Sequence, residues 1–193
     1  ANEGNVVSLA PATFNDLGTL DTHTATISWG DGTAVDVGVV GESPFGPPGS
    51  TAGANGTVSC SHVYADNGVY TVTVTVADDD GGATSDTLAV IVSNVAPTVE
   101  AWVNQTVNEG YVVSLASATF SDKGTLDTHT ATIDWGDGIT TQGVVAEGLD
   151  GPPGGSPIQG TVSGSHVYAD DGVYTVTVTV ADDDGGVTSD TLT

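Results

Sequence analysis

Two copies of one sequence occupy most of this chain, and this duplication limits what the chain can fold into. Residues 2–32 read NEGNVVSLAPATFNDLGTLDTHTATISWGDG, and residues 108–138 repeat them with few changes. Residues 61–88, SHVYADNGVYTVTVTVADDDGGATSDTL, recur in the same way at 165–192. The Gly- and Pro-rich segment between these blocks is two residues shorter in the second copy, as is typical of a surface loop. The 193 residues therefore predict two similar domains.

The register of the duplication predicts the domain boundaries. Residues 95–107 (VAPTVEAWVNQTV) lead into the second NEG, and nothing equivalent precedes the first. Residues 89–95 (AVIVSNV) have no counterpart after Thr193. We therefore expect repeats at 1–95 and 96–193, the first without its N-terminal strand and the second with a truncated C-terminal strand. The chain is then a piece of a longer array.

Period-two alternation predicts the secondary structure. In residues 70–76 (YTVTVTV), the tyrosine and the valines point one way and the threonines the other, as in a strand with one buried face. Residues 25–29 place Ala25, Ile27 and Trp29 on one face in the same manner. Helical periodicity is not seen in any window. The sequence predicts an all-β protein made of two tandem immunoglobulin-like β-sandwiches of about seven strands each.

One motif specifies the topology further. Residues 66–70 (DNGVY) and 170–174 (DDGVY) have the D-x-G-x-Y form of a tyrosine corner, in which the tyrosine hydroxyl donates to nearby backbone. Trp29 and Trp135 are then the expected core tryptophans of the two sandwiches.

These segments carry a family resemblance. ISWGDG at 27–32 and IDWGDG at 133–138 resemble the W-D-F-G-D-G signature of PKD domains, without its middle aromatic residue. Residues 61–82 resemble the family's H-x-Y-x-x-x-G-x-Y-x-V-x-L-x-V-x-D-x-x-G stretch. PKD domains are immunoglobulin-like repeats of surface proteins and secreted enzymes, so the resemblance implies an extracellular or cell-surface location.

Charge excludes several partners. The chain has 25 acidic residues against one cationic side chain, Lys123, which gives a formal net charge of −24. Such a surface repels nucleic acid and anionic membranes, and no apolar stretch has the length of a membrane helix. Because 38% of the residues are hydrophobic and alternate regularly, we expect a packed fold with the charge outside or around cations.

The acidic residues predict a metal site in each repeat. We expect the NEG segment, the loop at residues 15–23 and the DDDGG loop at 78–82 to lie at one end of the sandwich. Carboxylates that converge there repel one another unless a cation lies among them, and calcium prefers six to eight hard oxygen ligands. The predicted calcium ligands are Glu3, Asp16, Asp21, Asp78 and Asp80 in the first repeat, and Glu109, Asp122, Asp127, Asp182 and Asp184 in the second.

A simpler interpretation competes with this site. Asp and Gly are favoured in hairpin turns for backbone reasons, so DDDGG can be a turn with a solvated face. We assign Asp31-Gly32 and Asp137-Gly138 to turns on the same grounds. Glu3 and Glu109 favour calcium, because a strand start has no turn requirement for an acid.

Other chemistry is disfavoured. Cys60 is matched by Gly164, so no intramolecular disulfide forms, and a buried thiol is expected. The four histidines, which are expected to make structural hydrogen bonds, are His23, His62, His129 and His166. For His23, which follows Asp21, a place in the ion site is the alternative. Since a compact sandwich offers no obvious cleft, we predict that the chain is not an enzyme.

Two non-catalytic functions remain. The first is a calcium-rigidified spacer or fibre-forming segment of a surface or adhesion protein, with neighbouring repeats as partners. The alternative is an accessory module of a secreted enzyme that binds glycans or surface proteins. Glycan binding usually presents exposed aromatic residues, and only Phe45 and Trp102 are spare for it. Near-identical repeats therefore favour the spacer.

Overall fold

The computed structural model describes residues 1–43, 46–47, 49, 51–101, 103–148 and 151–193. Phe45 and Trp102 lie outside the described residues. Every regular element among the described residues is a β-strand, so none of these residues lies in an apolar helix of membrane-spanning length. The predicted all-β fold is confirmed.

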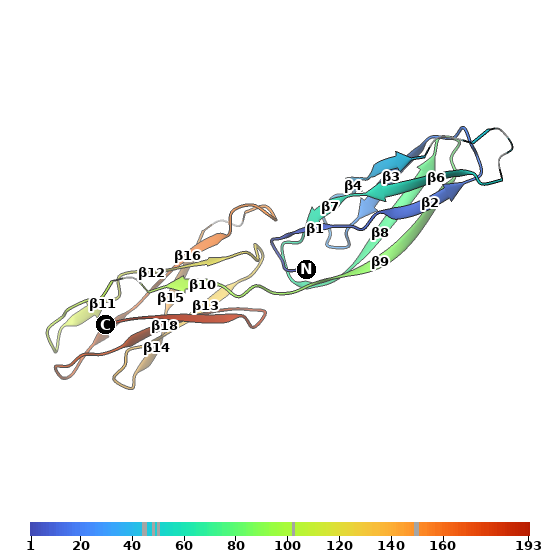
Figure 1. Ribbon diagram of the computed structural model, residues 1–193. Coiled ribbons are helices and arrows are strands. Elements are labelled where there is room, and N and C mark those ends of the chain that lie inside the picture. The colour runs from blue at the N-terminus through green and yellow to red at the C-terminus, as the bar shows by residue number, and fades with distance from the viewer. Residues whose placement is uncertain (44–45, 48, 50, 102, 149–150) are drawn as a thin grey trace. The chain divides into compact units, whose positions relative to one another are not determined.

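The described chain forms two compact units, each shown in Figure 1. The first unit consists of Ala1, residues 5–64 and residues 68–92. The second unit consists of residues 93–193 together with two short pieces of the first sequence repeat, residues 2–4 and 65–67. Each of these two pieces carries a carboxylate, Glu3 in the first and Asp66 in the second.

In the first unit, the strands form three antiparallel sheets, ordered β1-β7, β2-β6-β5 and β4-β3-β8-β9. The strands are β1 (Val6–Ser8), β2 (Ala12–Asp16), β3 (His23–Ser28), β4 (Asp36–Val37), β5 (Val39–Glu42), β6 (Ala54–Ser59), β7 (Ser61–Val63), β8 (Gly68–Asp78) and β9 (Ala83–Val92).

The second unit repeats this arrangement with sheets β11-β17, β10-β12-β16-β15 and β14-β13-β18-β19. Its strands are β10 (Thr98–Glu100), β11 (Val112–Ser114), β12 (Ala118–Asp122), β13 (His129–Asp134), β14 (Thr140–Gln142), β15 (Val144–Glu147), β16 (Ile158–Ser163), β17 (Ser165–Val167), β18 (Val176–Asp182) and β19 (Val187–Leu192). β10 has no counterpart among the described strands of the first unit.

Several of these strands are segments of one longer strand. β6 and β7 are separated by Cys60 alone, and β4 and β5 by Gly38 alone. At Gly38 the chain moves from one sheet to the other, since β4 pairs with β3 and β5 pairs with β6. A Cβ at Gly38 would lie 2.7 Å from side-chain atoms of Ile27 and Val58, so glycine permits this close crossing.

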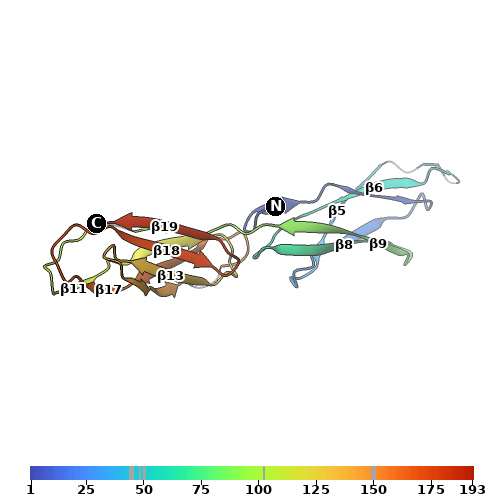
Figure 2. The same cartoon turned by 90° about the horizontal axis from the view of Figure 1, so that it is seen from below.

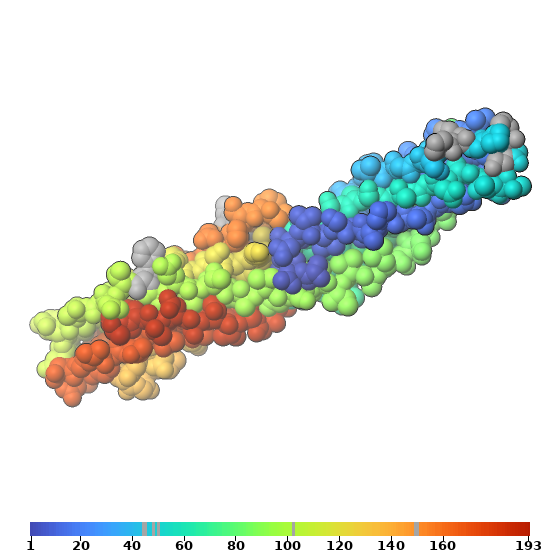
Figure 3. Space-filling view, in the orientation of Figure 1, coloured from blue at the N-terminus to red at the C-terminus, as the bar shows by residue number. Residues whose placement is uncertain are grey.

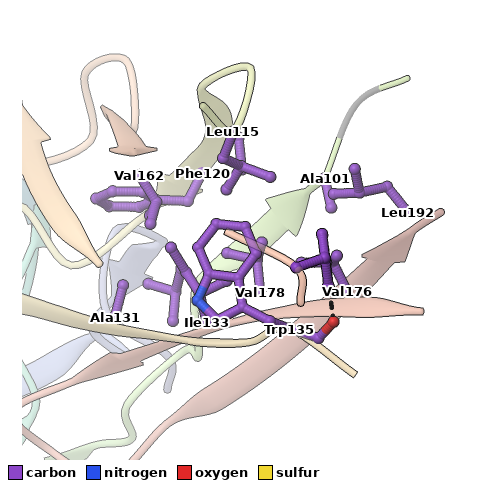
Figure 4. Packing of buried hydrophobic residues seen from close by; sticks show 13 residues of the cluster. Ala101, Leu115, Phe120, Ala131, Ile133, Trp135, Val162, Val176, Val178 and Leu192 are labelled. Carbon is purple, nitrogen blue, oxygen red and sulfur yellow. Dashed lines mark hydrogen bonds between the residues drawn. The ribbon is translucent and has the colours of Figure 1, made fainter. Parts of the chain in front are cut away.

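The alternating residues fill one core in each unit. Ala25, Ile27 and Trp29 are buried in the first unit, as the alternation predicts. Figure 4 shows the equivalent cluster of the second unit, in which the Trp135 indole lies among Ile133, Val176 and Val178. Cys60 is only half-buried at the edge of its core, so the prediction of a buried thiol is wrong there, because the residue lies in the break between two strands.

Tyrosine hydroxyls fix the ends of the cores. Tyr64 donates to the carbonyl of Trp29 at 3.1 Å, and Tyr168 donates to that of Trp135 at 2.9 Å. In the second unit, Tyr174 donates to the carbonyl of Asp170 at 3.0 Å, which is the predicted tyrosine corner.

One sheet edge differs between the units. β8 pairs with β9 from Gly68 through Ala77, whereas β18 pairs with β19 only from Val176 onward (Figure 2). β9 and β19 are edge strands that are exposed over much of their length, green and red in Figure 3. In the second unit, a pocket of about 890 Å³ lies beside Trp135, Tyr168 and Tyr174. In the first unit, the corresponding core contains Val90 and Val92 of β9.

Candidate metal centre

Strand register brings three loop carboxylates of the second unit together. Asp122 is the last residue of β12, and Asp182 is the last residue of β18. His129, which opens β13, pairs directly with Asp182 across the sheet. The loop between β12 and β13 carries Asp127 to the same place. Carboxylate oxygens of Asp122, Asp127 and Asp182 lie within 4.8 Å of one another.

These three carboxylates are withdrawn from solvent. The exposed fractions of Asp122, Asp127 and Asp182 are 2%, 4% and 8%. Asp122 Oδ1 accepts the amide of Gly124 at 3.0 Å, and Asp182 Oδ1 accepts that of Gly186 at 2.7 Å. Each of these two side chains therefore has one oxygen committed to its own turn, which fixes its orientation.

Two carboxylates from the first sequence repeat join this cluster. Oxygens of Glu3, Asp66 and Asp127 also lie within 4.8 Å of one another, as do those of Asp127, Asp183 and Asp184. Asp127 belongs to all three groups and is therefore the central residue. We call this set the complete site: Glu3, Asp66, Asp122, Asp127, Asp182, Asp183 and Asp184.

Backbone contacts within the second unit hold the two added carboxylates in place. The amide of Glu3 donates to the carbonyl of Ser93 at 3.1 Å, and Glu3 Oε1 accepts the amide of Val95 at 2.5 Å. The amide of Thr125 donates to the carbonyl of Ala65 at 2.9 Å, directly before Asp66.

Gly4 allows the NEG turn to approach the acidic loop. Its φ is +66°, and a Cβ there would lie 2.8 Å from the backbone oxygen of Lys123. Only glycine adopts this conformation readily while leaving room for that carbonyl. The glycine therefore allows Glu3 to reach the carboxylates of the second unit.

Five buried side-chain oxygens in this region have no hydrogen-bond partner among the described residues. Three are carboxylate oxygens, Glu3 Oε2 and both oxygens of Asp127, and the others are Asn94 Oδ1 and Thr125 Oγ1. Asn94 Nδ2 donates to Asp182 Oδ2 at 3.0 Å, which places its amide beside the cluster. Since buried polar atoms are nearly always paired in proteins, these five oxygens are the atoms of this region that could accept a hydrogen bond from water or bind a cation.

Crowding raises two of the pKa values. Burial, together with the charges of Asp122, Asp66 and Asp184, raises the pKa of Glu3 to about 7, against the lowering effect of the Val95 amide. Burial and the charges of four neighbours raise the pKa of Asp127 to about 7; these neighbours are Glu3, Asp122, Asp66 and Asp182. A bound cation would compensate the crowded negative charge and so lower both pKa values.

A histidine supports the site from behind. His129 Nε2 lies 3.1 Å from Asp122 Oδ2, and its Nδ1 lies 2.9 Å from Glu147 Oε1. Because carboxylate oxygens only accept, the protonated imidazolium satisfies both contacts. Burial lowers the pKa of His129, but these hydrogen bonds outweigh burial and raise it. The His129 imidazolium thereby holds the Asp122 side chain in one orientation.

The first unit contains the same loops in a more exposed form. Oxygens of Asp16, Asp21 and Asp78 lie within 4.8 Å of one another, and all three side chains are half-buried. His23 Nε2 lies 3.2 Å from Asp16 Oδ2, so this histidine also contacts the group. Asp80 is exposed and lies outside this group of three. We call Asp16, Asp21 and Asp78 the loop half.

A third group lies at the opposite end of the second unit from the complete site. Oxygens of Glu109, Asp170 and Asp171 lie within 4.8 Å of one another, and all three residues are exposed. The amide of Gly110 donates to the carbonyl of Tyr168 at 2.9 Å, which holds the NEG turn beside the residues that follow β17. We call this group the turn half.

The structure corrects one predicted grouping. The loop aspartates converge as predicted, but Glu3 lies with the carboxylates of the second unit, and Glu109 lies with Asp170 and Asp171. The physical reason is that β11 and β12 follow one another in one direction (Figure 1). The NEG turn before β11 and the loop after β12 therefore lie at opposite ends of a sandwich.

Sequence reasoning missed Asp66, Asp170, Asp171 and Asp183 as site residues. Asp66 and Asp170 were assigned only to the tyrosine corner, a structural turn. The available signal was the NEG segment: its acid precedes the strand that pairs with the end of the SHV segment, so the following ADNG turn lies beside it.

The other two histidines and the aspartates of the WGDG segments make contacts that hold turns and core residues in place. His62 Nε2 lies 2.7 Å from Asp31 Oδ2, and the ring stacks on Trp29 with centroids 4.7 Å apart. His166 and Asp137 make the same contact at 2.7 Å. Asp31 Oδ1 also accepts the amide of Thr33 at 3.1 Å, which is the predicted turn role.

Known proteins resemble this chain in a family model and in weak matches to solved structures. Comparison with curated proteins gives no match. Among solved structures, the fibronectin(III)-like modules of CbhA from Clostridium thermocellum are 14% identical, with a TM-score of 0.32, over 99% of this chain and 85% of that one. SGBP-B of the Bacteroides ovatus mixed-linkage glucan utilization locus, in complex with a mixed-linkage heptasaccharide, is 15% identical, with a TM-score of 0.21. That match covers 95% of this chain but only 40% of the other.

The family comparison is decisive. The model of the PKD domain matches residues 1–92 and 154–193, which is more than half of the chain. The matched segments include the ISWGDG sequence, both tyrosine-corner sequences and both DDDGG hairpins. This chain belongs to the PKD domain family.

Proposed function

We propose that this chain is a non-catalytic structural segment of an extracellular surface protein, in which calcium stabilises the repeats and stiffens their array. The observation that carries the proposal is the group of five buried oxygens without a partner around Asp127. A cation at the complete site would satisfy these atoms together.

The donor chemistry favours calcium over other cations. The complete site offers carboxylate oxygens, and the unpaired hydroxyl of Thr125 and amide oxygen of Asn94 are further hard donors. Calcium takes six to eight such ligands in flexible geometry, whereas magnesium requires a smaller octahedral set and keeps several waters. No thiolate or free imidazole contributes among the described residues of the site, which disfavours zinc.

Three further features of the chain support a function as a non-catalytic spacer. PKD domains are typically non-catalytic modules. The four histidines are engaged with carboxylates that hold turns and strand ends, so none is poised as a base toward a substrate. The complete site joins residues 2–4 and 65–67 to the loops of the second unit, so calcium bound there would restrict the motion of the chain on both sides of these segments.

The thermal midpoint in millimolar calcium, in chelator and in magnesium tests this function. Because a ligand that binds only the folded state stabilises by RT ln(1 + [L]/Kd), calcium at 100 times Kd adds about 2.7 kcal/mol. We expect a large shift with calcium and a small one with magnesium. Equal midpoints in calcium and chelator would contradict calcium binding and would support the interpretation of the DDDGG loops as hairpin turns on an acidic surface.

Affinity electrophoresis separates the spacer from an accessory module that binds glycans. A spacer migrates unchanged through gels that contain soluble polysaccharides. Retardation that depends on the polysaccharide would support the accessory module instead.

A further inference from the structure

The complete site draws its ligands from both sequence repeats. Asp122, Asp127 and Asp182 come from the second repeat, whereas Glu3 and Asp66 come from the NEG and ADNG segments of the first. All of them belong to the second compact unit. A PKD repeat of this type therefore supplies its own loops to one site and its NEG and ADNG turns to another.

The turn half contains the counterparts of Glu3 and Asp66, the two carboxylates that the first repeat gives to the complete site. Glu109 corresponds to Glu3, and Asp170 corresponds to Asp66. Asp171 replaces Asn67, which adds a third carboxylate. Glu3 is fully buried, whereas Glu109 is exposed.

The glycine of the NEG segment shows the same contrast. A Cβ at Gly4 would meet the backbone of Lys123, whereas a Cβ at Gly110 would have no atom within 4 Å. The φ angles of the two glycines are +66° and +75°, so the turn itself is preserved. Gly110 is thus in the conformation that Gly4 uses to approach an acidic loop, with space where that loop would lie.

The loop half is the more exposed counterpart of the loop carboxylates in the complete site. Asp16, Asp21 and Asp78 correspond to Asp122, Asp127 and Asp182, and each is more exposed than its counterpart. The supporting contacts are the same in both units. Asp78 Oδ1 accepts the amide of Gly82 at 2.7 Å, as Asp182 does from Gly186, and His23 takes the place of His129.

We propose that the loop half and the turn half are the two parts of one calcium site, and that a second copy of this chain joins them end to end. The inference rests on the proposed function, because it requires calcium at the complete site. In the assembled pair, the turn half of one copy meets the loop half of the next and reproduces the ligand set around Asp127.

Electrostatics make this assembly calcium-dependent. Each half carries three carboxylates, so two copies repel when no divalent cation is present. A cation held by oxygens from both copies converts this repulsion into attraction. Because the two halves are different surfaces, the contact is heterologous, and it leaves one open half at each end of the assembly. Chains of variable length are therefore expected rather than closed dimers.

The test is the molar mass of the full chain across a range of protein concentrations, by light scattering after gel filtration, in calcium and in chelator. One variant, Asp21→Asn, disables the loop half. A second, Glu109→Gln with Asp170→Asn, disables the turn half. Both leave the complete site unchanged. Calcium titration calorimetry on the same samples reports whether that site is filled.

The expected result has three parts. Wild type forms concentration-dependent species heavier than one chain in calcium and returns to monomer in chelator. Each variant alone stays monomeric. An equal mixture of the two variants forms dimers and nothing larger, because only one pair of intact halves remains.

Other results would overturn the inference in distinguishable ways. Calcium binding by a wild type that stays monomeric would overturn end-to-end joining and leave the proposed function intact. Assembly of either variant alone to the extent of wild type would also overturn it, because the halves would not be the contact. Absence of calcium binding would overturn both proposals.

Discussion

The two units carry nearly identical acidic loops in different surroundings. In the first unit, Asp21 is half-buried with Asp16 and Asp78 around it. In the second, the equivalent Asp127 is 4% exposed, and both its oxygens lack a partner among the described residues. The histidine and hairpin contacts that orient the loops are the same. The difference comes from Glu3 and Asp66, which the second unit has gained.

The acidic loop is buried in the unit where another turn covers it, and it is half-buried in the unit where none of the described turns does. The loop sequence fixes the orientation of its own carboxylates. The covering turn excludes water and adds charge, and both effects raise the pKa of Asp127. Calcium should therefore matter much more to the second unit than to the first.

The largest expected effect tests whether the two cores are equivalent. Trp29→Ala and Trp135→Ala each remove a fully buried indole, which typically costs about 3–5 kcal/mol of unfolding free energy. We expect similar losses in the two units in chelator. Differential scanning calorimetry measures them and assigns each transition to a unit. Unequal losses would show that the units differ in more than their acidic sites.

The next effect changes sign with calcium. Asp127→Asn removes a charge from a crowded, buried cluster, so in chelator it should raise the midpoint of the second unit. In calcium it should remove most of a stabilisation of about 2.7 kcal/mol at 100 times Kd, since the central ligand is lost. Asp21→Asn is the matched control and should leave the transition of the second unit unchanged. The same shift from Asp127→Asn in both conditions would contradict the site.

The pH dependence should separate the units in chelator. The pKa of Glu3 is raised from 4.5 to about 7 by burial and neighbouring carboxylates, so the folded state binds a proton that the unfolded state releases. Stability from this group is complete at acid pH and is lost as the pH rises toward 7 and above. Asp127 acts in the same direction.

Asp16 of the first unit has the opposite sign. The amide of Gly18 and the His23 side chain lower its pKa below the usual 3.8, so its contribution is lost only as the pH falls below that value. Calorimetric scans between about pH 5 and pH 8 should therefore show the second-unit midpoint falling with pH in chelator and much less in calcium. If the second-unit midpoint fell equally in calcium and in chelator, the titration of Glu3 and Asp127 would not be the cause of the fall.

The smallest effect concerns the turn half. Tyr174→Phe removes the hydrogen bond to the carbonyl of Asp170, at a cost of about 1 kcal/mol. We expect a small drop in the second-unit midpoint and unchanged calcium affinity of the complete site, because Asp170 lies at the other end of the unit. Loss of calcium affinity would mean that the two ends are coupled.

Much of this architecture could be predicted from the sequence. Alternation specified which faces of β3 and β8 are buried, and the D-x-G-x-Y motif specified the corner at Tyr174. The convergence of the β12–β13 loop with the DDDGG hairpin also followed from sandwich topology. These features depend on local pattern and on strand pairing within one repeat.

The placement of Glu3 and Asp66 could not be predicted in this way. Which loop the NEG turn covers depends on packing between segments far apart in the sequence, and the DNG turn already had a sufficient local explanation. The burial of Asp127 depends on the same packing. Sequence periodicity does not encode such contacts.

Calcium binding by the oxygens around Asp127, with the help of Glu3, underlies both proposals. The most direct measurement is a calorimetric titration of calcium into wild type and Glu3→Gln. We predict saturable binding by wild type, weakened at least about tenfold by the loss of the Glu3 charge. A titration of wild type that shows only the heat of dilution would contradict calcium binding at the complete site, and equal affinity in the variant would contradict a role for Glu3.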